Sequence, residues 1–421
     1  MNPKLRLVVM VFLQFYVWGA WLLTIGAYWF GNRHWSGAGF GAIFSTMGIA
    51  AIFMPSIAGI VADRWISAEK LYGVLHLCGA AVLCAVPAID TPASMFWAML
   101  LDMCFYMPTL SLGIAIAYNA LKGQGLDVVR EFPPIRVWGT VGFIAALWTV
   151  SLLHLETSPA QFYIAAAAAF ALGLYAFTLP NCPPRLAASN SRSLLDAIGL
   201  TSLKLFKDRQ MAVFLFFAML LGACLQLTNA YGDAFLHDFA GDARYKDLLA
   251  VRYPAIIMSI SQISETLFIL AIPFVFRRFG IKRVMTISML AWVLRFGLFA
   301  FGDPGPGLWM IVASCIVYGM AFDFFNISGS LFVESQSDTR IRASAQGLYM
   351  LMTNGIGAVL GSSLSGLAID RFFTSPGGIK DWHGIWLAFA AFALAMAVLF
   401  MAAFRYRHDP AGSRVSTAEA G

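Results

Sequence analysis

Five ionisable side chains lie inside long apolar runs of this sequence: Asp102, Arg136, Glu265, Arg295 and Asp323. A charged group at the centre of a lipid bilayer costs about 2.5–3.5 kcal/mol on insertion scales, so a membrane span that keeps one usually has a use for it. Carboxylates and guanidinium groups in such a place can bind a polar solute or carry a proton. These five residues are therefore the first candidates for function.

Arg136 begins one of these apolar runs, in the segment Phe132-Pro-Pro-Ile-Arg136-Val-Trp-Gly-Thr140-Val-Gly-Phe143. Arg136, Thr140 and Phe143 are spaced i, i+4 and i+7, which places them on one face of a helix. The alternative interpretation is an arginine at the membrane interface that extends its guanidinium group to water. The shared face favours a binding surface that combines a cation, a hydroxyl and a ring.

Carboxamides recur at helical spacing in two later runs. Gln226 and Asn229 are spaced i and i+3, as are Gln262 and Glu265. Amides both donate and accept hydrogen bonds and a carboxylate accepts them, so such faces suit a polyhydroxylated solute. Polar contacts between helices are the alternative interpretation, but they explain an ionised Glu265 poorly.

Aromatic rings flank the last of the five charges, in Tyr318-Gly-Met-Ala-Phe322-Asp323. We expect Tyr318, Phe322 and Asp323 to share one flank of a helix. Rings can stack on a flat apolar group, and a carboxylate can accept from hydroxyls. A nucleoside combines a flat base with a hydroxylated sugar and fits this pattern.

Asp102 and Arg295 fall in different halves of the chain. We expect each to form a structural ion pair or to bind carbonyls at irregular positions of a helix, not to bind a solute directly. His76 is expected to be a hydrogen-bonded core residue. No two cysteines form a C-x-x-C pair, so we expect free thiols and neither a metal nor a cofactor; the six are Cys78, Cys84, Cys104, Cys182, Cys224 and Cys315.

The composition indicates what must position these groups. Of the 421 residues, 60% are hydrophobic and only 12% are charged, whereas soluble domains carry roughly 25% charged residues. A membrane span needs ~20 apolar residues, and twelve segments qualify without the period-two alternation of membrane strands. The chain is therefore predicted to be an all-α membrane protein with spans at 7–30, 39–62, 71–89, 94–118, 136–154, 160–180, 211–232, 254–276, 283–301, 308–332, 343–369 and 384–405.

The loops predict the orientation and the domain organisation. Twenty of the 28 Lys and Arg residues fall in loops on the side of the two termini, which is typical of the cytoplasmic side. A basic cytoplasmic loop, 181–209, divides the spans into two sets of six. We expect six-helix bundles at 1–180 and 210–405, followed by a cytoplasmic tail at 406–421.

Two loop motifs suggest that the halves are related. The loop after the second span reads Gly59-Ile-Val-Ala-Asp63-Arg64, and the loop after the eighth reads Arg277-Arg278-Phe-Gly280-Ile-Lys282-Arg283. The first resembles the G-x-x-x-D-R signature of the major facilitator superfamily, and the second is similar to the R-x-G-x-K-R end of that signature. The resemblance implies two pseudo-symmetric six-helix bundles, the major facilitator fold.

Longer segments resemble one family within that superfamily, the nucleoside:proton symporters, over nearly the whole chain. They are Phe132-Pro-Pro-Ile-Arg136-Val-Trp-Gly-Thr140, Ile257-Met-Ser-Ile-Ser-Gln262-Ile-Ser-Glu265-Thr-Leu-Phe, Ala321-Phe322-Asp323-Phe-Phe-Asn-Ile-Ser-Gly and Arg342-Ala-Ser-Ala-Gln-Gly-Leu-Tyr-Met-Leu-Met-Thr-Asn354-Gly. The loops at 237–253 and 303–309 are spaced differently from the family pattern.

The resemblance implies proton-driven import of purine and pyrimidine nucleosides (uridine, adenosine, cytidine and thymidine type) across a bacterial inner membrane. We also expect a monomer that needs no cofactor, and no binding of nucleic acid, because the basic residues are scattered over short loops. The implied site is Arg136, Thr140, Phe143, Gln226, Asn229, Gln262, Glu265, Tyr318, Phe322 and Asp323. Glu265 or Asp323 is expected to carry the proton, with Asp323 favoured, and Arg136 is expected to tune either one.

Other interpretations of the sequence remain. A symporter of the same fold could take only xanthosine, or a sugar. A drug exporter is expected to have a less polar cavity than the paired amides indicate. A membrane enzyme or sensor would need a catalytic motif or an added domain, and the sequence contains no metal cluster, Walker A motif or nucleophile elbow.

Overall fold

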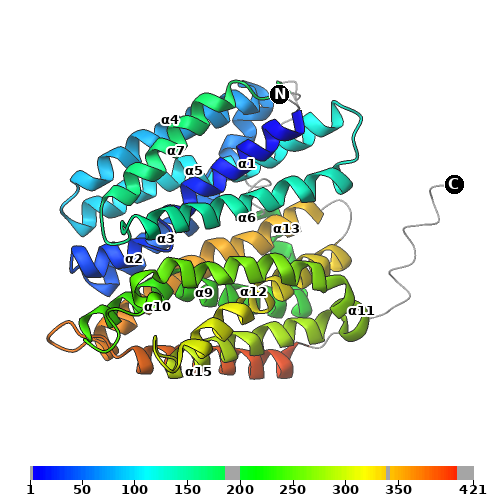
Figure 1. The fold of residues 1–421 in the computed structure, drawn as a ribbon. Helices are drawn as coiled ribbons and strands as arrows, with labels where there is room; N and C mark the ends of the chain where they lie inside the picture. Colours follow the sequence, from blue (N-terminus) through cyan, green and yellow to red (C-terminus); the bar gives the residue numbers. More distant parts are fainter. Residues whose placement is uncertain (1–2, 185–199, 338–341, 405–421) are drawn as a thin grey trace.

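The computed structural model describes residues 3–184, 200–337 and 342–404, and these residues are almost entirely helical (Figure 1). The central stretch 185–199 of the predicted cytoplasmic loop and the predicted tail lie outside them. The long helices are α1 (Pro3–Gly19), α3 (Gly37–Arg64), α4 (Ala68–Ala85), α5 (Pro92–Lys122), α6 (Val128–Leu152), α7 (Ala160–Ala176), α9 (Arg209–Asp238), α11 (Pro254–Phe301), α12 (Leu308–Gln336), α13 (Arg342–Met350), α14 (Ala358–Ala368) and α15 (Trp382–Ala403).

Short turns complete these helices. A π-helix, η5 (Leu351–Gly357), joins α13 to α14, and a second one, η6 (Ile369–Phe373), extends α14. The remaining short elements are α2 (Ile25–Ala27), η1 (Tyr28–Asn32), η2 (Val86–Ala88), η3 (Leu200–Lys207), η4 (Phe239–Gly241) and α10 (Leu249–Arg252).

Several helices start where a short polar side chain caps their first free N–H groups. Ser36 accepts a hydrogen bond from the N–H of Gly39, and Thr91 accepts one from Ser94. Asp208 caps α9 and Asp381 caps α15 in the same way. Ser, Thr and Asp are favoured here because their side-chain oxygens satisfy N–H groups that have no partner within the helix.

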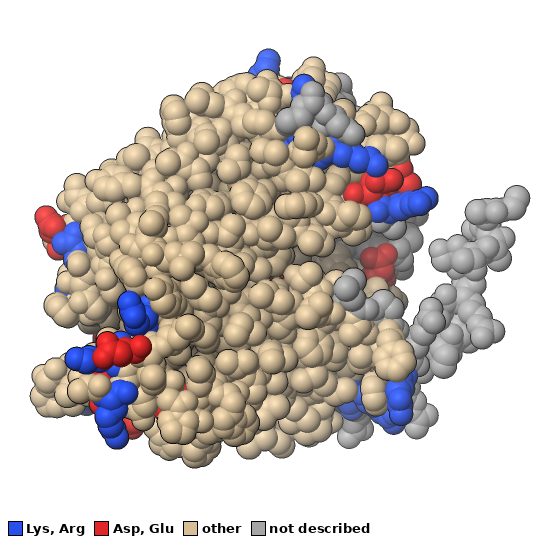
Figure 2. Space-filling view, viewed as in Figure 1, with Lys and Arg blue, Asp and Glu red and all other residues tan. Residues whose placement is uncertain are grey.

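Helix lengths and surface composition agree with a membrane protein. Among the described residues, nine helices are long and apolar enough to cross a bilayer, and Ala160–Ala176 and Pro254–Ile269 are shorter apolar helices. Together with the 17-residue α1, they correspond to the twelve predicted spans. Figure 2 shows charged residues at the two ends of the molecule and an uncharged band between them. Trp65, Trp97 and Trp309 are exposed near helix ends, as is typical of aromatic residues at a membrane interface.

The helices form two bundles, as predicted. Helices α1 to α7 lie together in the upper part of Figure 1, and α9 to α15 in the lower part. In the first bundle α1 packs against α6, α3 against α5 and α4 against α7; in the second, α11 packs against α12 and α15. The bundles meet along two seams, α3 against α14 and α6 against α11. Any space between these seams is bounded by both bundles.

Two predicted spans, 254–276 and 283–301, belong to one assigned helix, α11, which is broken at Gly280. The backbone of Gly280 has φ 70° and ψ 167°. Glycine has no Cβ and adopts a positive φ at little steric cost. The chain therefore changes direction at Gly280 and can return through the bilayer.

Candidate functional site

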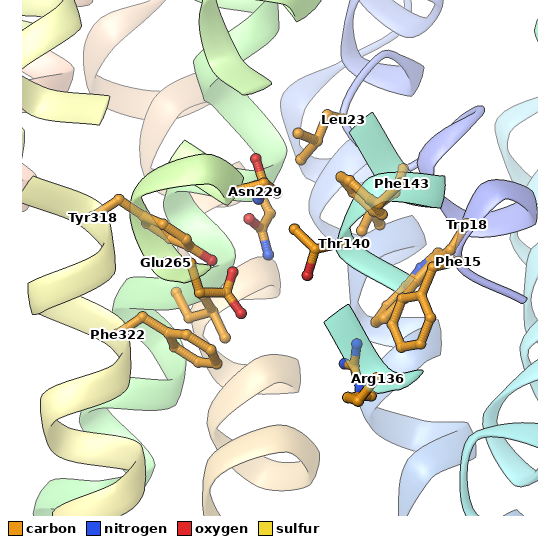
Figure 3. Close-up of a pocket in the computed structure, with 13 residues that line it drawn as sticks. Phe15, Trp18, Leu23, Arg136, Thr140, Phe143, Asn229, Glu265, Tyr318 and Phe322 are labelled. Atoms are coloured by element: carbon orange, nitrogen blue, oxygen red, sulfur yellow. The ribbon is translucent and has the colours of Figure 1, made fainter. Parts of the chain in front are cut away.

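A cavity of about 220 Å³ lies between the two bundles (Figure 3). The first bundle supplies residues from α1, the segment after it and α6, and the second bundle supplies residues from α9, α11 and α12. The lining residues are Phe15, Trp18, Leu22, Leu23, Arg136, Thr140, Phe143, Leu225, Asn229, Gln262, Glu265, Tyr318 and Phe322. Because both bundles form its walls, a rocking motion of one against the other changes access to the cavity.

Eight of the ten residues predicted for the site line this cavity: Arg136, Thr140, Phe143, Asn229, Gln262, Glu265, Tyr318 and Phe322. The other two, Gln226 and Asp323, are buried beside it. Each follows a lining residue, Leu225 or Phe322, and successive residues of a helix are turned by about 100°. On α12, Tyr318 and Phe322 therefore line the cavity, whereas Asp323, the third residue of the expected flank, does not.

The carboxylates of Glu265 and Asp323 lie close enough to interact electrostatically. Glu265 points into the cavity in Figure 3, and Oδ2 of Asp323 is buried without a hydrogen-bond partner among the described residues. Like charges in buried surroundings repel strongly because the local dielectric is low. A proton on either carboxylate removes this repulsion.

Arg136 is held on the opposite wall of the cavity. Its guanidinium carbon is 4.1 Å from the centre of the Phe15 ring, a cation–π arrangement. The same group interacts electrostatically with Glu265 across the space between the bundles. The cavity thus places a cation on the first bundle opposite a carboxylate on the second.

Two stacked rings form another part of the cavity wall. The rings of Tyr318 and Phe322 are 5.9 Å apart with an interplanar angle of 11°. Arg295 lies behind Tyr318, with its guanidinium carbon 4.7 Å from the ring centre. Ser314 O accepts a hydrogen bond from Nη1 of Arg295 at 2.6 Å. A fully buried cation therefore fixes the position of a cavity ring.

Arg295 does bind a backbone carbonyl, that of Ser314, but this carbonyl lies within the regular helix α12 and not at the irregular position that was expected. Neither Arg295 nor Asp102 forms an ion pair within the part of the chain that the structure describes, so that alternative was wrong for both. His76 is buried, with Nε2 3.1 Å from Oε1 of Gln14, and the prediction of a hydrogen-bonded core histidine is confirmed.

Close packing of α11 on α12 positions Glu265. A Cβ added to Gly319 on α12 would lie 2.6 Å from Ser264 O and 2.8 Å from Glu265 N. Ser264 Oγ also donates to Ile316 O across the same contact. The two backbones meet directly because residue 319 has no side chain.

We expect Gly319→Ala to lower the stability of the protein by about 1–3 kcal/mol, since a methyl group at this point must push two backbones apart. The midpoint of thermal unfolding of the purified protein in detergent measures this change. Gly297→Ala is the matched control, because no atom lies within 4 Å of a Cβ at Gly297. Equal midpoints for the two variants would contradict the packing argument.

The bundles are held together at the end of the molecule opposite the N-terminus, which we call the far end. Asp370, in η6 at the end of α14 in the second bundle, accepts from the N–H groups of Gly37 and Ala38, each at 2.7 Å. Glu156, in the loop after α6, accepts from Ala255 N at 3.2 Å. Each carboxylate thus caps the first turn of a helix in the other bundle, α3 or α11, where the helix dipole favours an anion.

Toward the opposite end, which carries the N-terminus, the described residues leave further space between the bundles. A second cavity of about 330 Å³ shares Phe15, Trp18 and Arg136 with the first one and continues along α1 and α6 to Met10 and Phe132. Figure 2 shows the surface hollowed between the bundles at this end. Among the described residues, contacts therefore join the bundles at the far end, whereas the cavities continue toward the end of the N-terminus.

Sequence reasoning missed the contribution of the first span to the cavity. Phe15 and Trp18 are spaced i and i+3 on α1, and this spacing of large rings was a usable signal. It also missed Glu156 and Asp370, whose partners lie 99 and 333 residues away along the chain. No local pattern links such residues.

Comparison with known proteins agrees with this architecture. The family model described as nucleoside H+ symporter matches residues 1–409. The chain belongs to the nucleoside H+ symporter family. It is therefore a multi-pass membrane transporter and not an enzyme.

Two Escherichia coli members of the family are similar in sequence. Xanthosine permease is 52% identical over 97% of this chain and 98% of its own length. Nucleoside permease NupG is 50% identical over 97% of each chain. The crystal structure of NupG superposes with a TM-score of 0.91, covering 97% of this chain and 100% of that one. Similarity over such lengths includes both bundles.

Proposed function

We propose that this symporter imports purine and pyrimidine nucleosides together with protons across a bacterial inner membrane. The observation that carries the proposal is the cavity between the bundles, where Arg136 and Thr140 face Glu265 and the Tyr318–Phe322 ring pair. The rings offer a stacking surface for a base. The carboxylate and amides offer acceptors and donors for ribose hydroxyls.

Transport proceeds by alternating access in this proposal. Bundles at residues 1–180 and 210–405 rock against each other around the cavity, so that it opens first to one side and then to the other. Both termini are cytoplasmic, in line with the distribution of Lys and Arg in the loops. The far end is then the outside, the described residues correspond to an inward-facing state, and the carrier acts as a monomer in this proposal.

Proton coupling uses the adjacent carboxylates of Glu265 and Asp323. With the cavity open to the outside, a proton enters and relieves their mutual repulsion. With the cavity open to the cytoplasm, Arg136 stabilises the ionised form of Glu265 and favours release of the proton. Gln226 and Asp323 act in this scheme from just behind the lining residues.

The test is uptake of radiolabelled uridine into cells that lack their own nucleoside carriers. We expect cells with this protein to accumulate uridine above the external concentration, and a protonophore to abolish the accumulation. Excess adenosine, cytidine or thymidine is expected to compete. Uptake that a protonophore leaves unchanged would contradict proton coupling.

A second candidate is a carrier restricted to xanthosine, because xanthosine permease is 52% identical over nearly its whole length. The same assay separates the two. If labelled xanthosine accumulates and labelled uridine does not, the narrow specificity holds. If excess sugar blocks uptake and excess uridine does not, the substrate is a sugar.

A further inference from the structure

Phe15 lines the substrate cavity but is not among the residues that the sequence predicted for the site. It lies on α1 at the border between the two cavities and contributes to the walls of both. Figure 3 shows its ring beside the side chain of Arg136, which extends from α6 of the same bundle. Among the described residues that line the substrate cavity, Arg136 is the only Lys or Arg. The ring therefore lies against the one cation of this wall.

The ring supplies the contact that holds this cation. The guanidinium carbon of Arg136 lies 4.1 Å from the centre of the Phe15 ring. Among residues 3–184, 200–337 and 342–404, no hydrogen bond or ion pair anchors the guanidinium group. A ring face attracts a cation electrostatically, whereas a hydrogen-bonded anchor would occupy some of the five N–H donors of an arginine. Phe15 thus holds Arg136 in place while these donors stay free.

Arg295 of the second bundle shows the opposite arrangement. Its guanidinium carbon also lies over a ring, that of Tyr318. Its N–H groups, however, donate to oxygens of Thr228, Ser261 and Ser314. Arg295 is fully buried and does not line the cavity. An arginine whose donors are taken up by protein oxygens serves packing, whereas one with free donors beside a cavity can serve a ligand.

Gly139 gives the ring and the cation the room to meet. It follows Arg136 by three residues on α6, and a Cβ at this position would lie 2.7 Å from Nη1 of Arg136 and 2.7 Å from Cδ2 of Phe15. Both atoms belong to the outer parts of side chains, so a methyl group would displace these side chains without forcing two backbones apart. The absence of a side chain at residue 139 therefore preserves the contact.

We propose that Phe15 is a positioning residue of this carrier: its ring holds the guanidinium group of Arg136 in the cavity wall and keeps the N–H groups available to the nucleoside. Phe15 acts through Arg136 and needs no contact of its own with the substrate. Gly139 supports the same role by leaving the space in which ring and cation meet. The effect on nucleoside binding rests on the proposed function, whereas the contact between ring and cation does not.

The role is tested by calorimetric titration of the purified full-length protein in detergent with uridine and with xanthosine. We expect Phe15→Leu, which keeps an apolar side chain but loses the ring, to weaken binding about 2- to 30-fold, the range that corresponds to loss of a cation–π interaction. Phe15→Tyr keeps a ring and is expected to retain more affinity than Phe15→Leu. Phe12→Leu is the matched control, because Phe12 lies three residues earlier on α1 and lines neither cavity. Equal affinities for Phe15→Leu and Phe12→Leu would overturn the proposal.

Gly139→Ala provides an independent test, because it displaces the cation without removing it. We expect it to bind uridine more weakly than the unsubstituted protein does. Gly297→Ala is expected to show no such loss, since no atom lies within 4 Å of a Cβ at Gly297. Unchanged affinity in Gly139→Ala would show that the position of the guanidinium group does not matter, and would overturn the proposal as well.

A series of fluorinated phenylalanines at position 15 separates the electrostatic role from packing. Each added fluorine withdraws electron density from the ring face with little change in size, and so weakens its attraction for a cation. We expect the affinity for uridine to fall with each fluorine, and this fall to disappear in the Arg136→Gln background. A fall that persists there shows that the ring stacks directly on the base, and an affinity that fluorination leaves unchanged shows a packing role alone. Either result overturns the proposal.

The contact itself is measured without substrate, by the midpoint of thermal unfolding. Phe15→Leu is expected to lower the midpoint less in the Arg136→Gln background than in the unsubstituted protein, because residues in contact have non-additive effects. Additive changes would show that ring and cation do not interact, and would overturn the proposal. Failure of the unsubstituted protein to bind either nucleoside counts against the proposed function instead, and leaves the result of this measurement intact.

Discussion

Asp323→Ala is expected to abolish the accumulation of uridine against its gradient. Its carboxylate is buried beside that of Glu265, and the two interact electrostatically. Removing one of them removes the repulsion that a proton relieves, and with it the advantage of binding substrate and proton together. Uptake is expected to fall to the level that a protonophore produces in the unsubstituted protein, and uridine binding to weaken.

Two measurements separate a coupling defect from a folding defect. Uridine binding to the purified variant is measured by calorimetry, and counterflow in proteoliposomes reports exchange that needs no proton gradient. Asp102→Asn is the matched control, because Asp102 is as buried as Asp323 but lies in the first bundle outside the cavity. Normal proton-driven accumulation in Asp323→Ala would remove this residue from the mechanism.

Glu265→Gln is expected to weaken uridine binding about 10- to 100-fold. The substitution keeps the size of the side chain but replaces a charged acceptor, and hydrogen bonds to charged groups contribute about 1.5–3 kcal/mol. It also leaves Arg136 without the carboxylate that faces it across the cavity. A charge left without its counterpart in buried surroundings is itself destabilising.

Calorimetric titration with uridine gives the affinity of each variant. Thr266→Val is the matched control, because Thr266 is the next residue of α11 and does not line the cavity. The double variant with Arg136→Gln completes a mutant cycle. If Arg136 acts through Glu265, the double variant loses less binding free energy than the sum of the two single variants. Strictly additive losses would show that the two residues act independently.

The residues of the cavity show how far local patterns reach. Arg136, Thr140 and Phe143 share a face because their spacing matches the helix period, and all three line the cavity. The same argument for the flank of α12 included Asp323, which lies just behind it. Spacing decides which residues share a face of a helix. Because successive residues are turned by about 100°, spacing alone does not decide whether a residue at the edge of that face lines the cavity; the packing of the helix decides this.

The number of spans, their apolar character and the positions of buried charges were determined by the sequence alone. They depend on residue type within ~20-residue windows, and the cost of a charge in lipid is a local quantity. Family membership could likewise be predicted from long contiguous segments, such as the one around Arg136.

Only the tertiary structure decided which groups complete the cavity and close the far end. The ring under Arg136 comes from Phe15 on another helix, and Glu156 meets His237 and Ala255 across the boundary between the bundles. These contacts depend on how each helix is rotated and tilted against its neighbours. Packing of the whole molecule sets those angles, and no short window of sequence contains them.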